Sequence, residues 1–190
     1  MEIEIGIGKT ARRGYGFDEV AIVPSRRTRD PDDVDVSWEI DAWRFDLPLL
    51  ASAMDAVVGP ASAVEIGRLG GLAVLNLEGI QTRYEEPEPI LDEIASLSDD
   101  KATRRMQELY REPIQEELVA RRIREIRDGG VVAAASLTPQ RVRKYADVIL
   151  QAELDLLVIQ GTVVSAEHVS TRTEPLNLKE FIARFEIPVV

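Results

Sequence analysis

Residues 47–80, LPLLASAMDAVVGPASAVEIGRLGGLAVLNLEGI, decide the fold of this chain. They begin with 47–50, a short apolar run with a proline, which predicts a buried strand. Gly59-Pro60 opens a helix, because proline suits the first helical position. Gly70-Gly71 ends that helix, since glycine accepts a left-handed cap, and 72–76 predicts a second buried strand. Strand, loop, helix and strand in this order build parallel sheets.

Two later stretches continue this pattern. The apolar runs at 131–135 and 155–160 predict a third and a fourth buried strand. Between them, Ser136 or Thr138 caps a helix that has Pro139 at its first position. This alternation of strands and helices indicates an α/β fold with a sequential parallel sheet.

The chain contains one informative internal repeat. FDLPLL at 45–50 and FEIPVV at 185–190 agree residue type for residue type. Because the first of them holds a strand, we expect a fifth strand to begin at Ile187, after a helix that Asn177 caps. An apolar strand without a partner is rare at the end of a natural domain. We therefore expect the chain to be the amino-terminal part of a longer protein, cut at the fifth strand.

The expected organisation has two parts. Residues 1–44 form an amino-terminal arm and hairpin, in which the apolar residues at 34–40 alternate with polar ones as in a half-buried strand. The glycines and basic residues at 6–16 admit two interpretations, a phosphate cradle or a flexible arm. The arm is favoured because no GxGxxG pattern is present. Residues 45–190 form the part that contains the strands and helices described above.

A charged stretch at 85–128 interrupts this second part. It is too long for one connection between a strand and a helix, which usually takes about 2–6 residues. Apolar residues recur in it at helical spacing, so we expect two or three amphipathic helices there. Its arginines could form a basic patch, but we interpret them as the solvated face of a helix whose carboxyl end favours cations: Arg121, Arg122, Arg124 and Arg127.

Composition excludes several function classes. The 190 residues suit one domain with a sizeable core, although a complete (β/α)8 barrel needs at least about 200. The net charge of −11 argues against nucleic acid or an anionic membrane as a partner. No apolar run approaches the length of a membrane span, and the amino terminus lacks the pattern of a secretory signal. We therefore expect a cytoplasmic protein.

Three segments resemble one known family. Ser52-Ala53-Met54-Asp55 precedes a helix that ends in Leu69-Gly70-Gly71. This is similar to the first βαβ unit of the IMP dehydrogenase and GMP reductase family, where a Ser-Pro-Met-Asp turn precedes such a helix. Residues 16–24, GFDEVAIVP, resemble the amino-terminal segment of that family, and 155–159, DLLVI, fits its fourth barrel strand. The closest fit is the branch of the family that lacks the regulatory CBS insert. Residues 85–128 stand where that insert lies in typical members.

The resemblance implies a TIM (β/α)8 barrel, of which this chain holds about the first four to five βα units. It also implies an oxidoreductase that converts IMP to XMP with NAD, in guanine nucleotide biosynthesis. The alternatives are a GMP reductase-type activity and a catalytically silent homologue that binds a purine nucleotide. The full-length protein is expected to be a homo-oligomer, which is a tetramer in this family. A monovalent cation is possible, at a site outside this chain.

Barrel active sites are built from loops at the carboxyl ends of the strands. By resemblance, Ser52 and Met54 bind the purine nucleotide, through a hydroxyl group and a soft thioether. Without the resemblance, Ser52 would be interpreted as a turn cap and Met54 as core filling. Asn76, Gln160 and Gly161 stand where family members carry histidines and an Asp-Ser-Ser pattern that holds the nicotinamide ribose. We assign these three residues to NAD binding, although Gln160 lacks the charge of that aspartate.

The sequence contains no cysteine. Disulfides, thiolate metal sites and a thiol nucleophile are therefore excluded from this chain. The resemblance implies nucleophilic catalysis by a cysteine on a loop after the sixth strand, so we assign no catalytic residue here. His168 is the only histidine, and one histidine without cysteines argues against a metal site. We expect the chain alone to be inactive.

Overall fold

The computed structural model describes residues 2–24, 26–161 and 177–190, and the chain divides into two compact units, Met1–Asp35 and Val36–Val190. In the first unit, β1 (Glu2–Gly6) pairs antiparallel with β2 (Lys9–Arg12). Two short 3-10 turns follow, η1 (Phe17–Glu19) and η2 (Pro31–Asp33). The flexible arm predicted here thus contains a hairpin, because left-handed Gly8 allows the tight turn between β1 and β2.

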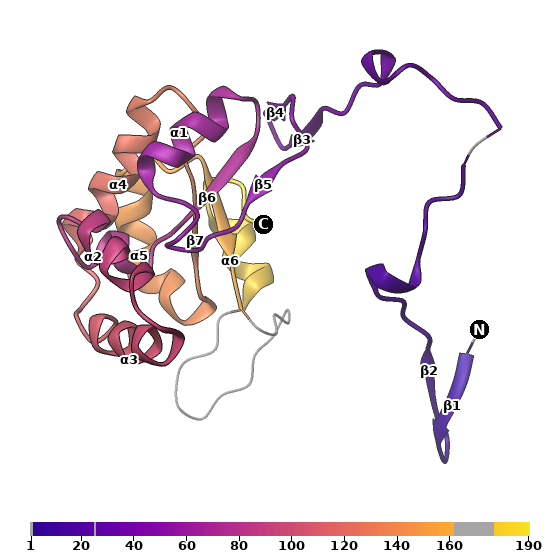
Figure 1. Cartoon of the computed structure of the whole chain (residues 1–190), viewed down its shortest axis with the longest axis horizontal. Helices are drawn as coiled ribbons and strands as arrows, with labels where there is room; N and C mark the ends of the chain where they lie inside the picture. The colour runs from indigo at the N-terminus through magenta and orange to yellow at the C-terminus, as the bar shows by residue number, and fades with distance from the viewer. Residues whose placement is uncertain (1, 25, 162–176) are drawn as a thin grey trace. The chain divides into compact units, whose positions relative to one another are not determined.

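The second unit is built on a four-stranded parallel sheet, in the order β5-β6-β7-β8 (Figure 1). Its strands are β5 (Leu50–Ala51), β6 (Leu72–Asn76), β7 (Ala134–Leu137) and β8 (Leu156–Ile159). Each strand pairs in parallel with the next one along the chain, and Leu157 forms a further parallel bridge to Val189. The sequential parallel sheet confirms the α/β class and a partial (β/α) barrel. The fifth strand expected from Ile187 is present only as the isolated bridge at Val189, two residues later.

Helices connect the strands and cover one face of the sheet (Figure 1). Gly70, with a φ of 89°, ends the first helix in the left-handed conformation that the sequence predicted. The stretch between β6 and β7 holds three helices, after the short 3-10 turn η3 (Ile80–Thr82). The helices are α1 (Pro60–Arg68), α2 (Glu88–Ala95), α3 (Asp99–Leu109), α4 (Glu116–Asp128), α5 (Pro139–Gln151) and α6 (Leu178–Arg184).

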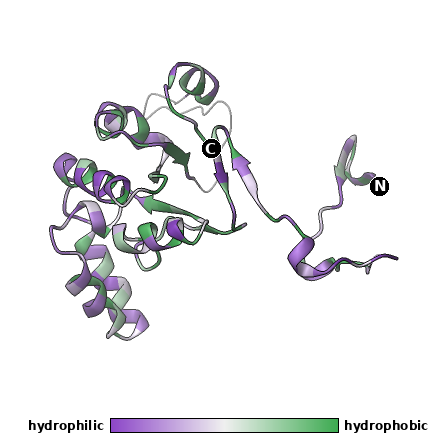
Figure 2. Ribbon diagram, turned by 90° about the horizontal axis from the view of Figure 1, so that it is seen from above, coloured by the Kyte–Doolittle hydropathy of each residue, from purple (hydrophilic) through white to green (hydrophobic). Residues whose placement is uncertain are grey.

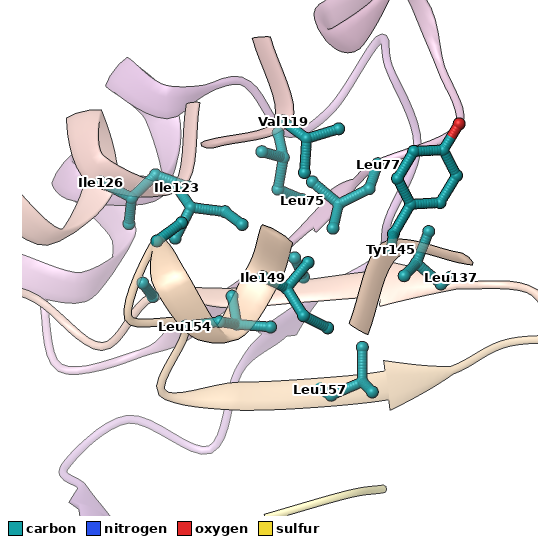
Figure 3. Packing of buried hydrophobic residues seen from close by; sticks show 14 of the residues in the cluster. Leu75, Leu77, Val119, Ile123, Ile126, Leu137, Tyr145, Ile149, Leu154 and Leu157 are labelled. Atoms are coloured by element: carbon teal, nitrogen blue, oxygen red, sulfur yellow. The ribbon is translucent and has the colours of Figure 1, made fainter. Parts of the chain in front are cut away.

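The main core lies between this helical layer and the sheet. Side chains alternate along each strand, so every second residue points to the helices. Figure 3 shows Leu75, Leu137 and Leu157 from the strands packed with Ile123 and Ile149 from α4 and α5. In Figure 2 the strands of the parallel sheet are mostly green, whereas the helices carry both colours, as amphipathic helices should.

The other face of the sheet, called here the inner face, carries a smaller apolar cluster. Leu72 and Val74 point to it, together with Ala134 and Leu156. An antiparallel hairpin of β3 (Trp38–Ile40) and β4 (Trp43–Phe45) covers this cluster. The Phe45 ring is buried there and stacks on Trp38, with ring centroids 4.7 Å apart. One end of the inner face is therefore filled by aromatic side chains.

Three expectations need correction. The strand predicted at 47–50 is shorter and is not buried: only Leu50–Ala51 form β5, an edge strand with one neighbour, and Leu47, Leu49 and Leu50 are exposed. The third strand begins at Ala134 rather than at 131, since the Ala133 amide donates to the Asp155 carboxylate and not to the ladder, at 2.9 Å.

The third correction concerns the arginines of α4, which were expected to be solvated. Arg122 is buried, and its guanidinium donates to the carbonyls of Gln81 and Glu85 and to the Glu125 carboxylate. It thereby holds the segment after β6 against α4. None of the helices in the described part of the chain combines the length and apolar character that spanning a bilayer requires.

Candidate functional site

Polar residues occupy the carboxyl ends of the strands on the inner face. The alternation that places Leu72 and Val74 on this face continues to Asn76 in β6. In the same way, Ser136 in β7 lies on the same face as Ala134, and Gln160, just after β8, lies on the same face as Leu156. Parallel strands deliver their carboxyl ends to one edge, so these three residues come together there.

A pocket of about 480 Å³ lies at this edge. Its size falls within the range of about 300–1,000 Å³ that is usual for small-molecule sites. Residues from five segments line it, among them Ala53, Asn76, Ser136, Thr138, Gln160 and Gly161. Its wall therefore offers amide, hydroxyl and backbone groups beside the charged side chains of Glu78 and Arg83. We call it the mouth pocket.

Asp55 organises the loops beneath the mouth pocket. Its carboxylate accepts hydrogen bonds from the Ile80 amide at 2.8 Å, the Tyr110 hydroxyl at 2.6 Å and the Asn76 side-chain amide at 3.3 Å. Gly79 passes so close that a β-carbon there would overlap this carboxylate. Asp55 therefore joins the loop after β5, the loop after β6 and the end of α3.

Glu78 connects the mouth pocket to α5. Its carboxylate accepts a hydrogen bond from the Thr138 amide at 2.6 Å and lies 3.7 Å from the Arg141 guanidinium. Thr138 is the N-cap of α5, where the helix dipole favours a negative charge. These contacts fix the Glu78 side chain, which is 20% exposed, in the wall of the pocket.

Arg83, directly after η3, and Tyr110, directly after α3, form one wall of the pocket. The Arg83 guanidinium donates to the Glu78 carbonyl at 2.9 Å and to the Glu112 carbonyl, and it lies 5.1 Å from the centroid of the Tyr110 ring. Burial and the hydrogen bond to the Asp55 carboxylate raise the pKa of Tyr110. The phenol therefore keeps its proton at neutral pH and remains a donor to Asp55.

The structure places the predicted site residues as follows. Asn76, Gln160 and Gly161 all line the mouth pocket. Ser52 and Met54 lie in the loop after β5, on either side of Ala53, which lines the pocket, and are themselves outside its lining. Met54 is 52% exposed, so it does not fill the core. Residues 162–176, which include His168, are outside the described residues.

Sequence reasoning did not assign Asp55, Glu78, Arg83 or Tyr110 to the site. Asp55 and Glu78 follow predicted strands, and this position alone could have marked them. Tyr110 lies 55 residues from Asp55 in the chain, and no local pattern indicates their hydrogen bond. Within the described residues, no group of three or more acidic, histidine or cysteine side chains is arranged to hold a metal ion.

A larger pocket, of about 630 Å³, opens at the opposite edge of the sheet. Its lining includes Asp46, Gly70 and Asp155, which precede strands β5, β6 and β8, and Arg127 near the end of α4. Arg127 pairs there with Asp155 at 2.9 Å and with Glu153 at 3.2 Å. Because barrel active sites form at the carboxyl ends of strands, the mouth pocket is the better candidate despite its smaller volume.

Comparisons with known proteins agree with this arrangement. The IMP dehydrogenase / GMP reductase domain matches residues 14–182. A protein of Mycobacterium tuberculosis named as an uncharacterized oxidoreductase is 46% identical over 193 residues, covering 99% of this chain and 52% of its own length. The inosine-5'-monophosphate dehydrogenase of Methanocaldococcus jannaschii is 29% identical over 98 residues, 47% of this chain and 20% of that protein.

A solved structure is similar over the same range. The IMP dehydrogenase/GMP reductase-like protein of Corynebacterium glutamicum superposes with a TM-score of 0.89 at 43% identity, over 99% of this chain and 50% of that one. The chain thus spans about half the length of the curated relatives that it matches over almost all of its residues. The match across residues 14–182 shows that this chain belongs to the IMP dehydrogenase / GMP reductase family.

Proposed function

We propose that this chain carries nucleotide-binding elements of an oxidoreductase of purine nucleotide metabolism, which oxidises IMP to XMP with NAD. The observation that carries the proposal is the mouth pocket, a polar cavity at the carboxyl edge of a barrel sheet in this family. Relatives named as oxidoreductases support the general reaction class. The expectations of a cytoplasmic homotetramer and of a purine nucleotide substrate belong to the same proposal.

The residues of the mouth pocket suit the nicotinamide ribose half of NAD. Asn76 and Gln160 offer amide donors and acceptors for ribose hydroxyls and for a carboxamide. Gly161 leaves the backbone open to close approach. When bound, NAD supplies the hydride acceptor. The chain contributes the orientation of the dinucleotide, through Asn76, whose amide is itself held by Asp55 at 3.3 Å.

The loop after β5 suits the purine nucleotide. Met54 is half exposed beside the pocket, and a thioether offers a polarisable apolar surface to a flat base. Ser52 is exposed too, so its hydroxyl is accessible to a sugar or a phosphate group. Both residues can contact a ligand without first leaving a packed core.

A second candidate is a homologue that binds the nucleotide without turning it over. Gln160 favours this candidate, because an uncharged amide holds a ribose less firmly than the aspartate that typical members carry there. GMP reductase-type activity would use the same pocket. The chain has no cysteine, so a thiol nucleophile for any of these reactions would come from outside these 190 residues.

Calorimetric titration of the chain with IMP and with NAD+ tests the proposal. Met54→Ala should weaken IMP binding, and Gln160→Ala should weaken NAD+ binding more than IMP binding. Matched controls are Met106→Ala, another half-exposed methionine in α3, and Gln151→Ala at the exposed end of α5. Equal affinities for all four variants and the parent chain would exclude these residues from the site.

A further inference from the structure

One wall of the mouth pocket comes from the helical stretch at 85–128 and not from the barrel strands. Tyr110 follows the last residue of α3, and it lines the pocket beside Asn76 and Gln160. Its side chain is only partly covered, since the residue keeps 37% of its surface exposed. The ring is therefore accessible to a molecule in the pocket.

The ring is nevertheless held in place from two directions. Its hydroxyl donates to the Asp55 carboxylate at 2.6 Å, while the Ile80 amide holds the same carboxylate at 2.8 Å. The Arg83 guanidinium lies over the ring, 5.1 Å from its centroid. Arg83 itself is 8% exposed and is fixed by the carbonyls of Glu78 and Glu112.

This combination is unusual for a surface tyrosine. Exposed side chains normally keep their rotamer freedom, and ordering one costs free energy. An aromatic ring that is fixed before a ligand arrives loses little further entropy on binding, so it contributes more to affinity. Flat rings pair with aromatic side chains in stacked or edge-to-face geometry. A fixed, accessible ring in the wall of a polar pocket is therefore suited to a flat heterocycle.

We propose that Tyr110 is a ligand-contacting residue of the mouth pocket, and that its ring receives a flat ring of the nicotinamide dinucleotide. This inference rests on the proposed function, and it adds the helical stretch at 85–128 to the proposed binding site. Asp55 and Arg83 are then positioning residues, because they hold Tyr110 rather than the ligand. The alternative is that the hydrogen bond between Tyr110 and Asp55 only fastens α3 to the barrel loops.

Titration of the 190-residue chain with NAD+ and with IMP separates these two roles. Tyr110→Ala should weaken NAD+ binding by about five- to hundredfold, the scale of one lost stacking contact, and should change IMP affinity by less than about threefold. Tyr110→Phe keeps the ring but loses its hydrogen bond to Asp55, so it should weaken NAD+ binding less than Tyr110→Ala does. Tyr84→Phe is the matched control, since its hydroxyl bonds to the Leu109 carbonyl at 3.1 Å and lies outside the pocket lining.

A second measurement does not depend on the folding of a variant. In the parent chain with NAD+, nuclear Overhauser effects between the Tyr110 ring protons and a ring of the dinucleotide should be observed. Binding of NAD+ without such effects, or with unchanged affinity in a folded Tyr110→Ala variant, overturns the inference and leaves the proposed function standing. Failure of both NAD+ and IMP to bind the parent chain overturns the proposed function, and this inference with it.

Discussion

Replacing Gly79 with alanine should disrupt the loops beneath the mouth pocket. The backbone at Gly79 has φ −96° and ψ −159°, which alanine can adopt. The penalty therefore comes from space and not from backbone strain. An added β-carbon would overlap the carboxylate of Asp55, and that carboxylate cannot move aside without losing its hydrogen bonds to Ile80 and Tyr110.

The magnitude follows from two contributions. Overpacking of a close-packed site costs about 1–3 kcal/mol. A hydrogen bond to a charged group contributes about 1.5–3 kcal/mol, but the Asp55 site is partly accessible, and water replaces part of that loss. Together these give a loss of about 2–5 kcal/mol in the free energy of unfolding. Gly14→Ala is the control, because nothing lies within 4 Å of a β-carbon there.

Urea denaturation of four chains measures the effect: the parent, Gly79→Ala, Asp55→Ala and the double variant. Removing the Asp55 carboxylate also removes the overlap, so the double variant should be less destabilised than the sum of the single variants, by about 1 kcal/mol or more. A Gly79→Ala chain within about 0.5 kcal/mol of the parent, or strict additivity in the double variant, would refute this reasoning.

Three further predictions concern the core, the pH dependence and the activity. Ile123→Ala, at a fully buried position of α4, should cost about 2–5 kcal/mol in chemical denaturation, and a loss below about 1 kcal/mol would contradict its place in the core. The pKa of Tyr110 is raised in the folded chain above its value of about 10 in the unfolded chain. The protonated phenol therefore contributes its full stabilisation of the fold only when the pH is below about 10. Stability should therefore fall as pH rises above about 10, more steeply than in Tyr110→Phe, and equal slopes would count against the hydrogen bond between this phenol and Asp55. The chain alone should produce no NADH from IMP in a spectrophotometric assay, because it contains no thiol, and measurable turnover would disprove this.

The order of strands and helices could be predicted because local residue patterns mark where each helix begins and ends. Pro60 starts α1, Gly70 ends it, and the Asn177 side chain accepts from the Glu180 amide at 3.2 Å as its capping pattern predicts. The limits of the strands were harder to predict. Apolar residues at 131–132 resemble a strand, but the strand begins only at Ala134, because the amide of Ala133 donates a hydrogen bond to the Asp155 carboxylate.

The candidate site could be predicted only in part. Asn76 and Gln160 follow from the rule that barrel sites form at the carboxyl ends of parallel strands. Tyr110 and Arg83 do not follow from it, because they reach the pocket through contacts between segments distant in the chain. The burial of Arg122 was missed for the same reason, since its carbonyl partners lie about 40 residues earlier in the sequence.

Hydrogen–deuterium exchange of the chain, with and without NAD+ and IMP, tests most directly the claim that the mouth pocket is the binding site. Protection on ligand addition should appear at the carboxyl edge, in peptides that contain 52–55, 76–79, 136–138 and 160–161. The opposite edge, in peptides that contain 43–46 and 67–71, should not change. Protection confined to that opposite edge, where the larger pocket lies, would contradict the account.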